Sequence, residues 1–172
     1  MLTELDTIYR KIEERRTEMI NRLEALPDAE QMMPPTTLEW SALQVVEHLI
    51  MYEELVCNWR ARAVGATASP SWKGRGFVGL MTWIMRSRLR IPTLPELQPQ
   101  SESNLLALCE RWRVVRVNLR TGLEAVTQER LPTVFILHPI AGPLNAMQVL
   151  QLLDAHLMYH QRHWPLEKKP SH

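Results

Sequence analysis

Residues 145–164, NAMQVLQLLDAHLMYHQRHW, have the period of an amphipathic helix. The apolar residues recur every three to four positions, which places them on one helical face. Asn145 is a residue type that favours the start of a helix, and Pro165 follows the end of the stretch. His156 and His160 stand four residues apart on this face, so both imidazole rings can converge on one point.

Three stretches upstream have the same helical period. The first covers residues 3–26 and ends at Pro27. The second begins at Trp40, where Ser41 and Gln44 form the pattern of a capping box. The third begins at residues 101–103 and ends near Gly122, whereas residues 131–145 are the one extended, β-branched segment.

The chain between the second and third helices is broken by glycines and prolines over residues 65–100. Within it, residues 79–90, GLMTWIMRSRLR, can form a short basic helix. A structureless loop of this length is unusual in a compact domain, so we interpret it as a long crossover. The sequence therefore predicts an all-α fold: a single four-helix-bundle domain over residues 1–172, with one long crossover carrying a short helical insert.

Composition limits the classes of function. The formal net charge of +1 gives no reason to expect nucleic acid or an anionic membrane as a partner. No apolar run reaches the roughly 18 to 20 residues of a membrane span, and the charged N-terminus does not have the pattern of a secretory signal. Cys57 and Cys109 lack a paired CxxC spacing, so we expect reduced thiols and a cytoplasmic protein.

His48 lies in the middle of the apolar face of the second helix, which can face the last helix in a bundle. Together with His156 and His160 it can form a three-nitrogen site with open coordination positions, which is typical of a catalytic metal. The simpler interpretation is a set of hydrogen-bonded core histidines without metal. Imidazole ligands suit Zn, Ni, Cu and Fe alike, so the ligands alone do not name the metal.

Three stretches of the chain carry a combined pattern. Residues 40–49, WSALQVVEHL, place a Trp-Ser helix start before an inward His. Residues 138–164, HPIAGPLNAMQVLQLLDAHLMYHQRHW, carry a His-Pro, a Gly-Pro-Leu turn and two His four residues apart. Residues 90–99, RIPTLPELQP, form a proline-rich stretch before the third helix. Over most of its length the chain thus resembles the DinB-like superfamily, also called YfiT-like.

The resemblance implies a four-helix bundle, frequently a homodimer, that holds a divalent metal (Zn or Ni) on three histidines. Carried over position by position, the ligands are His48, His156 and His160. Characterised relatives include thiol-dependent transferases and isomerases that use bacillithiol, mycothiol or glutathione. The resemblance therefore implies a small-molecule substrate, a low-molecular-weight thiol as co-substrate, and S-transfer or hydrolysis as the reaction.

Two positions depart from the family pattern. Leu157 stands where a polar residue is common, and His163 stands where Gln is usual. His163 is one turn beyond His160, and we interpret it as a catalytic donor beside the ligands or an exposed terminal residue rather than a fourth ligand. Tyr52, one turn after His48, is a second candidate catalytic residue; the alternative is a core Tyr whose hydroxyl reaches solvent.

Other polar residues near these motifs have weaker patterns. His138 precedes Pro139, which forces extended geometry on the residue before it, so the pair indicates a turn. Glu47 and Glu53 lack the spacing of a general base. A basic cluster in the crossover can receive an anionic substrate or can form a solvated face; it contains Arg86, Arg88 and Arg90.

Two functions remain open at this stage. The first is a metal-dependent enzyme, either a thiol S-transferase or a hydrolase. The second is a non-catalytic, stress-related bundle that binds a small ligand or partner and in which the metal is structural or absent.

Overall fold

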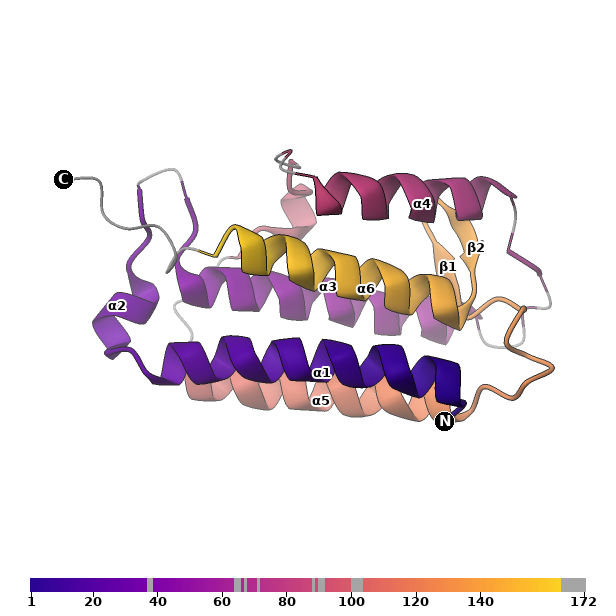
Figure 1. Cartoon of the computed structure of the whole chain (residues 1–172), viewed down its shortest axis with the longest axis horizontal. Coiled ribbons are helices and arrows are strands. Elements are labelled where there is room, and N and C mark those ends of the chain that lie inside the picture. The colour runs from indigo at the N-terminus through magenta and orange to yellow at the C-terminus, as the bar shows by residue number, and fades with distance from the viewer. Residues whose placement is uncertain are drawn as a thin grey trace.

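The main body of the protein is a bundle of four long helices (Figure 1). The computed structural model describes residues 1–36, 39–63, 66, 68–70, 72–87, 89, 92–99 and 104–164. The four helices are α1 (Thr3–Glu24), α3 (Ala42–Ala63), α5 (Leu105–Glu124) and α6 (Ala146–Arg162). The predicted all-α fold with a helical bundle is confirmed.

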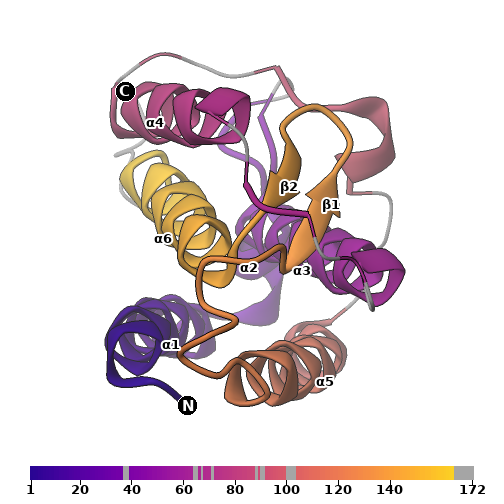
Figure 2. The same cartoon turned by 90° about the vertical axis from the view of Figure 1, so that its right-hand side faces the viewer.

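The four helices pack around one apolar core. Helix α1 contacts α5 and α6, and α3 contacts the same two helices, so α1 and α3 occupy opposite corners (Figure 2). Each helix contributes fully buried side chains, for example Ile12, Ile50, Trp112 and Leu150. Burial of these apolar stripes is the main stabilising contribution to the bundle.

A buried ionic network also joins three of the helices. Arg116 of α5 is 3% exposed and pairs with Glu13 of α1 and with Glu53 of α3, the latter at 3.3 Å. Its guanidinium lies 4.5 Å from the ring centroid of Tyr9. Such a network depends on all its partners, since a buried charge that loses its partner is strongly destabilising.

Local capping signals fix the starts of α3, α5 and α6. The amide of Gln44 donates to Ser41 Oγ at 3.2 Å and the amide of Ser41 donates to Gln44 Oε1 at 2.9 Å, which confirms the predicted capping box. Asn145 and Gln148 form a second capping box at α6. Helix α5 begins after Asn104, whose side chain caps it, and the predicted start at residues 101–103 lies outside the described residues.

The helical insert of the crossover is longer than predicted. Helix α4 spans Trp72–Arg86, so the predicted start at residue 79 was wrong. Glycines that were expected to break the helix lie inside it. A Cβ on Gly74 would lie 3.1 Å from Leu144 Cδ2 and 3.2 Å from the carbonyl oxygen of Pro143. Glycine here lets α4 approach the neighbouring strand closely, and this packing outweighs the low helix propensity of about 1 kcal/mol per glycine.

The extended segment forms a small antiparallel hairpin of β1 (Ile136–His138) and β2 (Gly142–Leu144). Gly142 has φ 72°, a left-handed conformation that favours glycine. Two short helices complete the fold: α2 (Asp28–Met32), which follows Pro27, and the 3₁₀ turn η1 (Pro95–Leu97). Neither was predicted from the sequence.

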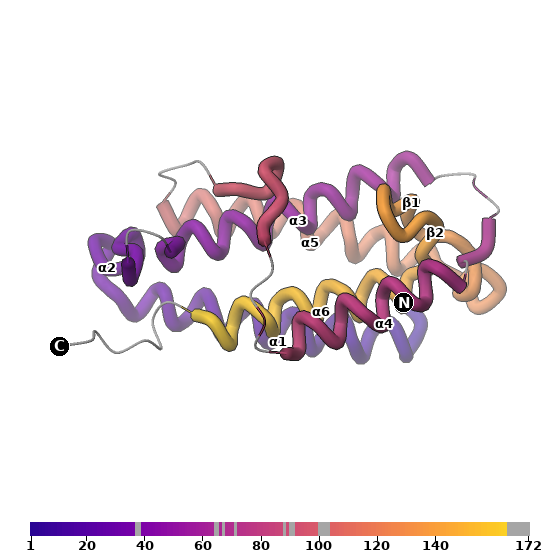
Figure 3. Tube along the Cα trace, turned by 90° about the horizontal axis from the view of Figure 1, so that it is seen from above, coloured from indigo at the N-terminus to yellow at the C-terminus, as the bar shows by residue number. Residues whose placement is uncertain are grey.

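Helix α4, the hairpin and η1 form a layer on one side of the bundle, whereas α2 lies at one end of it (Figure 1). Helix α4 runs alongside α6, whereas the hairpin and η1 lie over α3 (Figure 3). Within the described residues, no helix combines the length and apolar composition needed to span a lipid bilayer.

Candidate metal centre

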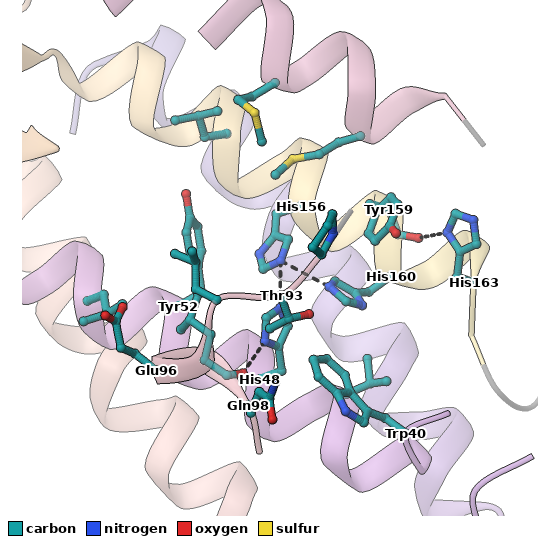
Figure 4. Close-up of a pocket in the computed structure, with 18 of the residues that line it drawn as sticks. Trp40, His48, Tyr52, Thr93, Glu96, Gln98, His156, Tyr159, His160 and His163 are labelled. Atoms are coloured by element: carbon teal, nitrogen blue, oxygen red, sulfur yellow. Dashed lines mark hydrogen bonds between the residues drawn. The ribbon is translucent and has the colours of Figure 1, made fainter. Parts of the chain in front are cut away.

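Three imidazole rings from two helices converge at one point (Figure 4). Nε2 of His156 lies 3.1 Å from Nε2 of His48 and 3.2 Å from Nε2 of His160. The candidate ligand atoms of all three lie within 4.8 Å of one another. The predicted convergence of these side chains is confirmed, and their service as metal ligands stays a prediction.

The local structure explains how the rings are aimed. His156 and His160 lie four residues apart on α6 and therefore share a face. His48 lies on the facing helix, α3, where its Nδ1 is 2.8 Å from the carbonyl oxygen of Leu97 in η1. A carbonyl oxygen only accepts, so the Nδ1–H of His48 donates to it and the lone pair of Nε2 points into the cluster.

Two of the three distances between the ligand atoms suit a bound cation. Nitrogen ligands at about 2.0–2.1 Å from a tetrahedral zinc ion lie roughly 3.3 Å apart, close to the two distances that involve His156, whereas the ligand atoms of His48 and His160 lie within 4.8 Å of each other. Without a cation, a single proton on His156 can serve both neighbours only through a bifurcated bond. The donor set therefore fits a divalent metal held by three neutral imidazoles.

Electrostatics keeps these rings in their neutral, ligating form. Burial lowers the pKa of His156 well below 6.5, and the positive forms of His160 and His48 would lower it further. Burial likewise lowers the pKa of His160 to about 3 and lowers the pKa of His48, against the hydrogen bond to Leu97. Protonation therefore does not compete with metal binding near neutral pH.

The cluster opens into a cavity of about 630 Å³ between the bundle and the additional layer. Its walls come from α3, α4, α6, the hairpin and the segment around η1. Most of the lining is apolar or aromatic, including Trp40, Leu55, Phe77, Met81 and Leu152. A cavity of this size suits a small molecule.

The two candidate catalytic residues both line this cavity. The ring of Tyr52 packs edge-on against His156 at 4.5 Å, and its hydroxyl points toward the α4 side of the cavity (Figure 4). Burial raises its pKa to about 12, so the phenol is neutral at physiological pH. The Nδ1–H of His163 donates to the carbonyl oxygen of Tyr159 at 2.9 Å, and this ring lies outside the group of convergent ligand atoms.

Among the weaker candidates, the two glutamates and the arginines are not part of the described cavity lining. Glu47 and Glu53 are buried and pair with Arg111 and Arg116 of α5. Arg86 is exposed and its carbonyl oxygen accepts from Arg162; Arg88 and Arg90 lie outside the described residues.

Three contributions to the site were missed by sequence reasoning. The ring of Trp40 lies 4.9 Å from that of His48. The carbonyl of Leu97 orients His48, and no sequence signal marks a backbone group. His138 forms the predicted turn but also lines the cavity, where its ring packs between those of Trp59 and Phe77. These neighbours come from other parts of the chain, so the sequence did not reveal this position.

The chain matches the family model of the DinB superfamily over residues 11–163. It therefore belongs to the DinB superfamily, as the sequence motifs indicated. Comparison with curated proteins and with solved structures gave no match.

Proposed function

We propose that the protein is a metal-dependent enzyme that acts on a small molecule, with a divalent cation, Zn or Ni, on His48, His156 and His160. The observation that carries this proposal is the meeting of three Nε2 atoms on the wall of a 630 Å³ cavity. Three protein ligands leave a coordination position for a reactant, which is the arrangement of catalytic rather than structural sites.

A cation held by these three histidines would supply Lewis acidity, which would lower the pKa of a coordinated water or thiol and so support hydrolysis or thiol transfer. The protein side chains orient the reactants. The neutral Tyr52 hydroxyl can donate a hydrogen bond to a substrate or leaving group. His163, whose Nδ1–H is held by the carbonyl of Tyr159, presents the lone pair of Nε2 as an acceptor when the ring is neutral.

The thiol in an S-transfer reaction would come from a co-substrate. Cys57 hydrogen-bonds to the carbonyl of Val115 and is absent from the described cavity lining, and so is Cys109. Burial raises the pKa of Cys57 to about 11, with the charge of Glu53 adding to the effect. A thiol of this pKa is a weak nucleophile at neutral pH, so a low-molecular-weight thiol is the appropriate co-substrate.

The test begins with protein purified without chelator and without a nickel column. Elemental analysis should give about one Zn or Ni per chain, and the chelated protein should lose turnover and regain it on reloading. The substrates are a panel of electrophiles with glutathione, bacillithiol or mycothiol, together with a panel of esters. Background rates throughout, or turnover unchanged by the loss of metal, would refute the proposal.

One observation favours a second function, a non-catalytic binding bundle. In the described part of the chain, no carboxylate hydrogen-bonds to a ring of the cluster, so no carboxylate general base is placed beside the metal position. The bond from His48 to the carbonyl of Leu97 orients a metal ligand equally well in either function. In a binding bundle the metal would only join α3 to α6, and His160→Ala would lower stability in a protein that has no activity to lose.

We also propose a cytoplasmic homodimer. Exposed apolar side chains on α4 support self-association, with Trp72 at 73% and Trp83 at 63% exposure. Cys57 and Cys109 are both free, as expected in a reducing compartment. Light scattering after gel filtration should give twice the mass of the chain, and a monomer mass at micromolar concentration would exclude the dimer.

A further inference from the structure

His138 lies in the same cavity as the three-histidine cluster but at a different place. It ends β1, is 8% exposed, and its ring lies 4.8 Å from that of Trp59 and 5.0 Å from that of Phe77. Trp59 is eleven residues after His48 on α3, which corresponds to about 16 Å along the helix. The cavity therefore has two polar positions, the cluster near one end and His138 near the other.

The hairpin turn fixes the tautomer of His138. The backbone amides of Ile140 and Ala141 both donate to Nδ1, each at 3.1 Å. A nitrogen that accepts carries no proton, so the neutral ring must be protonated at Nε2. Burial lowers the pKa of His138, which keeps the ring neutral at physiological pH.

The Nε2–H of His138 is therefore a hydrogen-bond donor that needs an acceptor. No partner for it is found among the described residues, and the side chain lines the cavity while being more than nine-tenths buried. Buried donors are nearly always satisfied by protein, water or ligand. An acceptor on a molecule bound in the cavity would satisfy this one.

The remaining lining defines the chemistry of that molecule. Between the two polar positions the walls are formed by aromatic and aliphatic side chains, including Leu55, Phe77 and Met81. Among the described lining residues there is no Lys or Arg, whereas Glu39 and Glu96 contribute carboxylates. Away from the metal position, this balance of charge disfavours an anion and favours an uncharged, largely apolar molecule.

We propose that the cavity binds an elongated, uncharged, largely apolar molecule and that His138 Nε2–H donates to its carbonyl or ether oxygen. The inference rests on the proposed function only in taking the three-histidine end as the reacting end. His138 is a specificity residue, since it selects molecules that carry an acceptor at the correct place. A buried donor of this kind discriminates against an analogue without the acceptor because it is then left unpaired.

The test measures the displacement of a neutral fluorescent probe, N-phenyl-1-naphthylamine, from the full chain as purified. The competitors are 2-acetylnaphthalene, which has a carbonyl acceptor, 2-ethylnaphthalene, which has the same shape without it, and the anion 2-naphthoate. The comparison is the ratio of the affinities of the ketone and the hydrocarbon in each protein variant. Dividing the ratio of the wild-type protein by that of a variant removes the difference in hydration between the two compounds, because this difference is the same for both proteins.

His138→Asn and His138→Gln separate the two roles of the ring. Asn keeps an acceptor near the position of Nδ1 for the turn but lacks the donor of Nε2, whereas Gln places an amide donor near Nε2. The affinity ratio should fall about tenfold in His138→Asn and be largely restored in His138→Gln, which is the effect of one hydrogen bond. Circular dichroism shows whether each variant is folded.

A wild-type measurement keeps the proposal testable if a variant does not fold. In ¹⁵N-histidine spectra of the wild-type protein, His138 should show a proton on Nε2, and its signal should shift with the ketone but not with the hydrocarbon. The proposal is refuted by an unchanged affinity ratio in folded His138→Asn, by absence of the Nε2 proton, by equal binding of 2-naphthoate to the chelated protein, or by failure of the neutral probe to bind.

These readouts need neither metal nor turnover, so the assay is run on both chelated and zinc-loaded protein. Binding that depends on His138 in a protein without catalytic activity would refute the proposed enzyme and leave this inference standing. Metal-dependent turnover with no effect of His138 on the affinity ratio would refute this inference and leave the proposed enzyme standing.

Discussion

Replacing His160 with Ala should remove most of the stabilisation that zinc gives the protein. At free zinc equal to 100 times its dissociation constant, the wild-type chain should gain about 2.7 kcal/mol of unfolding free energy. For a chain of this size that corresponds to a rise in Tm of about 5 to 11 °C. His160 contributes one of three nitrogens that meet within 4.8 Å.

The magnitude for the variant follows from the energy of one ligand. Structural zinc sites with four ligands bind with about 10–16 kcal/mol, or roughly 3 kcal/mol for each ligand, so the loss of His160 should weaken binding at least about 100-fold. At the same zinc concentration the variant should then gain only about 0.4 kcal/mol, a rise in Tm of about 1 to 2 °C. Differential scanning fluorimetry with zinc buffered by a competing chelator measures both values.

His163→Ala is the matched control, because His163 ends the same helix but lies outside the group of convergent nitrogens. It should keep the full response to zinc. The reasoning fails if zinc, nickel and cobalt all leave the wild-type Tm unchanged, or if His160→Ala and wild type respond equally.

Three further results are expected. Arg116→Met should lower the unfolding free energy in urea by about 3 to 5 kcal/mol, because it leaves the buried carboxylate of Glu53 unpaired. Arg113→Ala, on the exposed face of the same helix, should change it little, and equal losses would contradict the role of the network. Stability should fall as the pH drops below 6.5, in part because folded His138 stays neutral whereas the unfolded residue gains a proton. The loss between pH 7 and about pH 5.5 should be smaller in His138→Asn, and an equal loss in urea titrations would count against the buried neutral ring. Cys57, with a pKa near 11 when folded, should react with iodoacetamide at pH 8 about 100-fold more slowly than in the unfolded chain; similar rates by mass spectrometry would contradict its burial.

The parts of the fold that depend on neighbouring residues could be predicted from the sequence. The capping box of Ser41 and Gln44 needs only residues three positions apart and forms as predicted, and Asn145 caps α6 as predicted. The pairing of His156 and His160 likewise follows from helical spacing. Helical periodicity is similarly local, which is why four long stripes were sufficient to predict the bundle.

The parts that depend on distant contacts could not be predicted in this way. Gly74 lowers the helix propensity of its segment, and only its close approach to Leu144 on β2 explains why the helix continues through it. The position of His48 opposite His156 required the arrangement of the bundle, which the family resemblance supplied. The tautomer of His138 depends on two backbone amides in a turn, which the sequence alone does not orient.

The crossover is best explained by the cavity rather than by the core. The four long helices bury one another, so a short connection between α3 and α5 would be enough for a bundle. Instead the crossover supplies Phe77 and Met81 to one wall, and its η1 turn supplies the carbonyl that orients His48. The entropic cost of closing a loop grows only slowly with its length, so a modest stabilising or functional contribution is enough to offset the cost of the long crossover. We propose that the orientation of His48 and the closure of the cavity provide this contribution, so that the function of this chain lies where the crossover meets α3 and α6.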